Sequence, residues 1–102
     1  MKELFELSNE VRQIIPQAPE WERIIQISGK LLKMAQDIND SGLIQDIIED
    51  KDDFDRSMQY AKSAKKKAEA YQRIKTQFHS RITSLGMAQG LDLDTLNALT
   101  RI

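Results

Sequence analysis

One run of sequence decides the fold: residues 43–85 read LIQDIIEDKDDFDRSMQYAKSAKKKAEAYQRIKTQFHSRITSL. The run contains no proline and no glycine, the residues that most often interrupt a helix. Its apolar residues recur at spacings of three and four, which is the spacing of one face of an α-helix. The pattern predicts one long helix over residues 42–85, roughly 60 Å in length at 1.5 Å per residue.

The run also has one weak point. Adjacent like charges and poor helix formers between Asp50 and Asp55 could divide it into a shorter and a longer piece. We favour a continuous helix, with a break in this acidic segment as the alternative. From Phe54 to Leu85 the apolar positions advance by about 3.5 residues on average, the period of a left-handed coiled coil. The long helix is therefore expected to pack in a coiled-coil-like manner.

Two shorter helices are predicted before the run. The first, over residues 2–15, has an apolar face made of Leu4, Leu7, Val11 and Ile14. Pro16 and Pro19 then mark a corner, because proline removes a helical hydrogen bond, and Pro19 suits the first turn of the next helix. That second helix is predicted over residues 19–38. Gly29 within it indicates either a close helix crossing or a merely tolerated glycine.

Turn residues bound the run on both sides. Residues 39–42 read NDSG, which supplies side chains that cap helices and a residue that accepts positive φ. Gly86 is predicted to stop the long helix, and Gly90 to interrupt the chain again. A short helix over residues 92–100 follows, beginning at Asp92 or Asp94.

The composition supports a single domain over residues 1–102. A chain of 102 residues with 40% apolar residues can bury one modest core, and only 4 glycines and 2 prolines favour helix over sheet. The expected fold class is all-α. Two short N-terminal helices would form a bundle with one long coiled-coil-like helix of about 40 residues, followed by a short C-terminal helix.

The absence of cysteine and of long apolar runs bears on location. Without cysteine there is no disulfide framework, which is compatible with a reducing cytosol. Residues 1–7 mix charged residues into the apolar ones, unlike a signal peptide. No apolar run approaches the roughly 20 residues needed to cross a bilayer. We expect a cytoplasmic protein with no membrane partner.

Few residues suggest catalysis or metal binding. His79 is the only histidine, so no zinc ligand set or Cys-His pair can form, and it is interpreted as a surface or seam-edge residue. An EF-hand loop counted from Asp50 would place Asp55 and Ala61 where glycine and glutamate are required. We therefore expect no enzyme activity, no catalytic residue, no cofactor and no metal.

The leading interpretation is a non-enzymatic helical protein-protein interaction module, such as an adaptor, chaperone-like protein or inhibitor. Two short helices cannot cover the whole seam of the long helix, and the remainder must meet a partner. The predicted partner or dimer interface comprises Phe54, Met58, Ala61, Ala64, Ala68, Tyr71, Phe78 and Ile82.

The order of charges indicates what that partner is. Among the charged residues, acids predominate in residues 41–60 and bases in residues 61–85. An antiparallel homodimer of long helices centred near Ala64 would set Asp55 near Arg73, whereas a parallel dimer would place like charges together. We therefore expect an antiparallel homodimer, with a monomer as the alternative.

A basic segment supports an alternative function. Nucleic acid could be contacted by Lys62, Lys65, Lys66, Lys67, Arg73, Lys75 and Arg81. However, three consecutive lysines spread around a helix instead of forming one stripe, and the chain as a whole is not basic. A nucleic-acid-binding regulator is thus the second interpretation.

The C-terminal tail, residues 91–102, allows two interpretations. Its leucines follow two glycines and are Leu91, Leu93, Leu96 and Leu99. They could form a segment that docks on a partner, or they could cover the open end of the bundle. A segment of about a dozen residues is marginal as an independent helix, which leaves both readings open.

Overall fold

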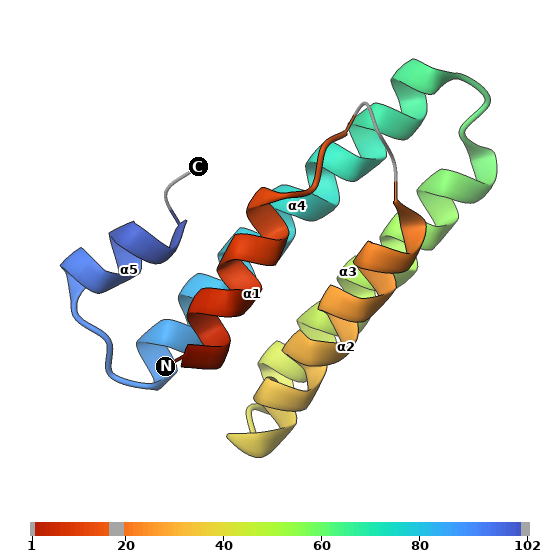
Figure 1. The fold of residues 1–102 in the computed structure, drawn as a ribbon. Helices are drawn as coiled ribbons and strands as arrows, with labels where there is room; N and C mark the ends of the chain where they lie inside the picture. Colours follow the sequence, from red (N-terminus) through yellow and green to blue (C-terminus); the bar gives the residue numbers. More distant parts are fainter. Residues whose placement is uncertain (1, 17–19, 101–102) are drawn as a thin grey trace.

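The computed structural model describes residues 2–16 and 20–100. Within these residues the chain forms five α-helices, which are α1 Lys2–Arg12, α2 Trp21–Asp37, α3 Ser41–Tyr60, α4 Ala64–Ala88 and α5 Leu93–Thr100 (Figure 1). No strand occurs in this described part of the chain. The predicted all-α fold class is confirmed.

The first four helices run alternately up and down (Figure 1). α2 packs on α3, α3 packs on α4, and α1 closes the bundle by packing on α4. α2 and α4 also touch across the middle. α5 lies at the end of α4 and contacts both α4 and α1.

The prediction of one helix over residues 42–85 is wrong. The chain instead forms α3 with 20 residues and α4 with 25 residues, joined by extended backbone at residues 61–63. Ser63 begins the new helix, because its hydroxyl oxygen accepts a hydrogen bond from the backbone N–H of Lys66 at 3.2 Å. Such an N-cap satisfies an N–H group that has no partner inside the helix. The chain reverses here, and α3 and α4 form an antiparallel hairpin.

The alternative break, between Asp50 and Asp55, does not occur either. This acidic segment stays helical because cations neutralise it. Lys51 binds Asp55 at 2.6 Å one turn away, and Arg81 from α4 binds Asp50 at 2.6 Å. Repulsion between neighbouring carboxylates is thereby offset.

α1 ends at Arg12, earlier than the predicted residue 15, and Pro16 explains the difference. A proline ring clashes with the carbonyl four residues before it, which here belongs to Arg12, and disfavours helical backbone at the preceding residue. The Nζ atom of Lys75 donates to the carbonyl oxygens of Arg12 and Ile14 at 3.3 and 2.8 Å. A lysine of α4 therefore closes the end of α1.

α2 falls within the predicted range of residues 19–38, although the expected first-turn position of Pro19 lies outside the described residues. Gly29 is exposed on this helix, and a Cβ atom there would meet nothing within 4 Å. The close helix crossing considered for Gly29 is absent, and the glycine is merely tolerated.

α2 and α4 both end on left-handed backbone. Asn39 follows α2 with φ 55°, and Gly90 follows α4 with φ 78°. The N–H of Leu91 reaches back to the carbonyl of Gly86 at 3.0 Å, and the equivalent bond closes α2 at 3.2 Å. This pattern is the Schellman motif, which requires a residue that accepts positive φ. The predicted interruption at Gly90 is confirmed.

Gly86 does not stop α4, contrary to the prediction, because the helix continues to Ala88. A Cβ atom at Gly86 would lie 2.6 Å from Cδ2 of Leu96 and 3.1 Å from Cδ1 of Leu91. The missing side chain lets the leucines of the tail pack against the backbone of α4. Gly86 thus makes room for α5.

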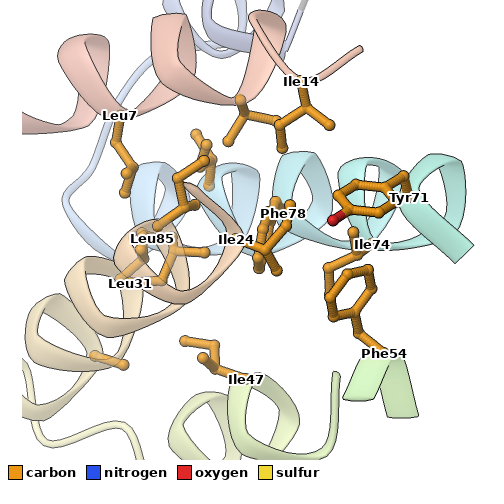
Figure 2. Packing of buried hydrophobic residues seen from close by; sticks show 14 of the residues in the cluster. Leu7, Ile14, Ile24, Leu31, Ile47, Phe54, Tyr71, Ile74, Phe78 and Leu85 are labelled. Atoms are coloured by element: carbon orange, nitrogen blue, oxygen red, sulfur yellow. The ribbon is translucent and has the colours of Figure 1, made fainter. Parts of the chain in front are cut away.

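The core runs along the centre of the bundle, where side chains from α1, α2, α3 and α4 meet (Figure 2). The ring of Phe54 packs edge-on against Tyr71 at 5.1 Å between centroids and against Trp21 at 5.7 Å. Phe78 is fully buried between these rings and the aliphatic layers around Leu31 and Leu85. Burial of such side chains contributes about 1.5–3 kcal/mol each.

Candidate interaction surfaces

The residues predicted to meet a partner lie mostly inside the bundle. Phe54, Met58, Tyr71, Phe78 and Ile82 are buried in the core of the chain. The three alanines of the same prediction lie at or near the bend between α3 and α4, where Ala61 and Ala68 are half-buried and Ala64 is exposed. In this fold the five larger side chains therefore offer no surface to another protein.

The acidic and basic blocks expected to pair between two copies pair within one chain, although Asp55, expected near Arg73, binds Lys51 instead. Arg73 of α4 lies 3.6 Å from Asp53 of α3. Arg81 binds both carboxylate oxygens of the buried Asp50, at 2.6 and 3.0 Å, and lies 3.6 Å from Asp46. The hydrogen bond to Asp50 raises the pKa of Arg81 above its ordinary value. Antiparallel pairing of the acidic and basic blocks is thus achieved by the α3–α4 hairpin.

An exposed apolar surface lies instead along α2 and α3. Trp21, Ile25 and Leu32 share one side of α2, and the contact of Trp21 with Phe54 places that side next to α3. Ile44 and Ile48 share the side of α3 opposite the carboxylates that face α4. We call the surface formed by Trp21, Ile25, Leu32, Ile44 and Ile48 the outer seam.

The outer seam combines anchored and exposed side chains. Leu32 and Ile44 are half-buried against the core. Trp21 is 42% exposed, Ile25 50% and Ile48 39%. In the sequence, the apolar residues of α2 form one broad stripe. The width of the stripe could have distinguished the exposed residues from the buried ones. Trp21 and Ile25 lie well to one side of the buried Ile24, Ile27 and Leu31.

The predicted nucleic-acid contacts divide into two groups. Arg73, Lys75 and Arg81 are engaged with Asp53, with carbonyls at and just after the end of α1 and with Asp50, respectively. Lys62, Lys65 and Lys67 are exposed and have no ion-pair partner among the described residues, whereas Lys66 lies 3.7 Å from Glu69. The free lysines line a shallow groove with Pro16, Ser63, Ala64 and Ala68.

Tyr60 adds an aromatic ring to this end of the bundle. It is exposed at the end of α3 and lines a neighbouring hollow together with Lys62 and Lys66. The start of α4 also carries the partial positive charge of a helix N-terminus. We call Tyr60, Lys62, Lys65, Lys66 and Lys67 the lysine tip.

His79 is not a surface residue, because its side chain is only 6% exposed in the seam of α4 with α1. Neither ring nitrogen has a hydrogen-bond partner among the described residues. Burial lowers the pKa of His79 below its ordinary value of 6.5, and the charges of Lys75 and Arg12 lower it further. His79 is thus held neutral inside the protein and is poorly placed to act on a substrate.

The tail packs on the bundle through three of its four leucines. Leu99 is fully buried, Leu91 and Leu96 are half-buried, and Leu93 is 71% exposed. Asp92 begins α5 as predicted, because its carboxylate accepts the N–H of Thr95 at 2.8 Å.

Two side chains of α1 hold the other end of α5. The hydroxyl of Ser8 donates to the carbonyl of Leu99. The guanidinium of Arg12 donates to the carbonyls of Ala98 and Leu99 at 2.5 and 3.1 Å. A cation at a helix C-terminus also interacts favourably with the helix dipole.

Within residues 2–16 and 20–100, no group of three or more His, Cys, Asp and Glu side chains could hold a metal ion. In the same residues, no helix combines the length and the apolar character that crossing a membrane requires. Comparison with protein-family models, curated proteins and solved structures finds no match to the chain.

Proposed function

We propose that this chain is a non-enzymatic helical module that binds another protein by packing a partner helix along the outer seam. The observation that carries the proposal is the exposure of Trp21, Ile25 and Ile48 on adjoining sides of α2 and α3. Apolar side chains gathered on one surface mark interaction sites more often than the same residues scattered singly.

The chemistry of the outer seam suits a helix. Two antiparallel helices leave a groove between their side chains, into which a third helix can place residues at spacings of three and four. Trp21 lies at one end of this groove, and tryptophan is one of the side chains enriched at binding hot spots. Lys51 and Asp55, on the same side of α3, neutralise each other at 2.6 Å. The expected partner is therefore an amphipathic helix with an apolar face.

Affinity capture followed by reconstitution tests this function. The bait is used as wild type, as Ile25→Glu and as Gln26→Glu, where Gln26 is an exposed neighbour on the other side of α2. Proteins lost only with Ile25→Glu are then purified and titrated with the chain. Trp21, the only tryptophan, reports binding by its fluorescence. We expect Ile25→Glu to weaken binding by about tenfold or more and Gln26→Glu to leave it unchanged.

The result that contradicts the proposal is equal binding of a purified partner by wild type and Ile25→Glu. Both substituted positions are exposed, so the melting temperature should stay within about 2 °C of wild type in each variant. A loss of binding without a loss of stability then belongs to the outer seam itself.

A second candidate function is binding of nucleic acid by the lysine tip. The specific observation is that Lys62, Lys65 and Lys67 have no acidic partner among the described residues, and that Lys62 also lines a hollow with the exposed Tyr60. Lysines bind phosphates, and an aromatic ring can stack on an unpaired base. Single-stranded nucleic acid would use both kinds of group.

Gel retardation tests this second function. The double variant Lys65→Glu/Lys67→Glu is compared with Lys33→Glu, which changes an exposed lysine of α2 outside the lysine tip. Binding should be lost in the double variant, retained in the control and weakened by added salt, because phosphate contacts release counterions. Absence of retardation of the wild type at low salt would remove nucleic acid from consideration.

A further inference from the structure

The bend between α3 and α4 differs from the other helix ends. α2 and α4 end on the left-handed residues Asn39 and Gly90, and no other described residue has a positive φ. The bend at residues 61–63 uses extended backbone, with φ −73° at Ala61 and −135° at Ser63. These residues can all adopt helical backbone without strain.

The two helix ends at the bend are also only partly capped. Ser63 caps the start of α4, but no backbone hydrogen bond outside the helix closes the end of α3 among the described residues. In a straight helix the free groups on both sides of the bend would bond to each other. Among the junctions whose residues are all described, the bend is therefore the one at which no backbone hydrogen bond closes the preceding helix.

From this geometry we propose that two copies of the chain exchange residues 64–100 by straightening residues 61–63 into helix. In the exchanged dimer, α3 and α4 of each copy form one continuous helix, and two such helices run antiparallel. Residues 2–60 of one copy then pack on residues 64–100 of the other. The partner is a second copy of this chain, and the contacts in each half are those of the monomer.

Charge complementarity supports a second copy as the occupant. The pairs Asp53–Arg73 and Asp50–Arg81 join the facing sides of α3 and α4, one nearer the bend and one farther from it. An antiparallel pair of straight helices that crosses at the bend restores both pairs between copies. The aromatic contact of Phe54 with Tyr71 is restored in the same way. Exchange therefore removes none of these contacts, which is the condition for domain swapping.

The exchange of halves leaves the surface of the proposed function unchanged. The outer seam lies on α2 and α3 of the same half, so it stays exposed in the monomer and in the exchanged dimer. Exchange alters only the connection between the halves. A variant such as Ile25→Glu should leave the exchange unchanged, whereas a dimer formed through the outer seam would lose affinity.

Two matched substitutions at the bend should shift the equilibrium in opposite directions. The Ser63 cap stabilises only the bent form, so two caps are lost when two chains form the exchanged dimer. Ser63→Ala removes the cap from the bent form, and this loss no longer opposes dimer formation. The dissociation constant of the dimer should therefore fall by about 30-fold. Ala64→Pro suits the exposed first position of α4, and Ser63 already has the extended backbone that precedes proline. In a continuous helix the same proline would clash with the carbonyl of Tyr60. Ala64→Pro should therefore abolish the dimer.

Chemical cross-linking identifies the exchange, because the chain has no cysteine of its own. Single variants Asp53→Cys and Arg73→Cys are unfolded together, refolded together at high protein concentration and treated with a short bis-maleimide. The two cysteines face each other only when the halves come from different copies. Light scattering measures the mass of each variant against the 11.8 kDa of one chain.

The expected result is a dimer that cross-links between residues 53 and 73, is enriched by Ser63→Ala and is absent in Ala64→Pro. A monomeric mass for wild type and Ser63→Ala after refolding at high concentration would overturn the proposal. A dimer that persists in folded Ala64→Pro, or that forms without the cross-link between 53 and 73, would also overturn it.

Discussion

Helix α4 meets the rest of the bundle along two different sides. Toward α3 it presents Arg73 and Arg81, each matched by a carboxylate. Toward α1 it presents Lys75, which binds backbone carbonyls, and His79, which has no hydrogen-bond partner among the described residues. Paired side-chain charges determine how α4 packs on α3. The side facing α1 and α5 is held by packing and by backbone groups.

This difference predicts different weaknesses. A charged pair sets the register of two helices and fails when one partner is removed. A seam held by apolar side chains and carbonyl contacts fails when the packing is reduced or when a buried neutral group becomes charged. Substitutions on each side of α4 can test whether the two seams respond in these separate ways.

The largest effect is expected at the α5 side. Leu99→Ala removes the one fully buried leucine of the tail and should lower the free energy of unfolding by about 3 kcal/mol. Leu93→Ala, at the exposed leucine of the same helix, should change it by less than about 0.5 kcal/mol. Urea denaturation followed by circular dichroism measures both. Equal, small effects would mean that the tail is a docking segment and not part of the core.

The next effect is expected at the α3 side. Asp50→Asn keeps the shape of the side chain but leaves the guanidinium of Arg81 without its closest counter-charge, so stability should fall by about 2 kcal/mol. Asp52→Asn, at an exposed acid on the same helix, is the control and should be nearly neutral. If both variants unfold at the same urea concentration, the pair does not hold the hairpin.

A smaller effect distinguishes the two sides by pH. Because the folded-state pKa of His79 is lowered, the unfolded chain binds a proton more readily than the folded chain. The contribution to stability is fully present above about pH 6.5 and declines as the pH falls through that value, by at most about 1.4 kcal/mol per pH unit. Urea titrations at several pH values measure the slope.

His79→Leu supplies the control for this pH dependence. Leucine cannot be protonated, so the decline that begins below about pH 6.5 should disappear, since carboxyl groups titrate mostly at lower pH. Asp50→Asn should retain the decline, because His79 lies on the other side of α4. Persistence of the slope in His79→Leu would assign it to other groups.

The smallest effect is expected at a position outside both seams, and it serves as a reference for the other effects. Gly29→Ala places a methyl group where nothing lies within 4 Å, so only helix propensity changes. The variant should be more stable by about 1 kcal/mol, which raises the melting temperature by roughly 4–8 °C in a domain of this size. Calorimetry checks the sign. A destabilised variant would indicate that this face of α2 has a contact in solution.

Sequence reasoning located the helices well and the bend poorly. Spacings of three and four gave the helices, and Asp92 and Gly90 marked real boundaries. The bend was not predicted because the apolar pattern continues through it. The pattern continues because α3 and α4 face the same core. Its signal was Ser63, an N-cap residue inside a run of good helix formers. A cap residue within a helical pattern permits a break but does not require one.

The candidate surfaces were predictable only in part. The charge order predicted antiparallel pairing of the acidic and basic blocks, but a hairpin and a dimer satisfy that order equally. The outer seam was missed because local periodicity does not tell how much of a wide apolar stripe the neighbouring helices cover. The position of His79 depends on where α1 and α5 pack, which no local pattern specifies.

The contacts between Ser8 of α1 and Leu99 of α5 join positions 91 residues apart in the chain. Closing so long a loop is entropically unfavourable until the intervening helices are in place. We therefore expect the α2–α3 and α3–α4 hairpins to assemble first and α5 to dock last. In native-state hydrogen exchange, the amides of α5 should then exchange through a partial opening. Those of α4 beside Phe78 should exchange only when the whole bundle unfolds.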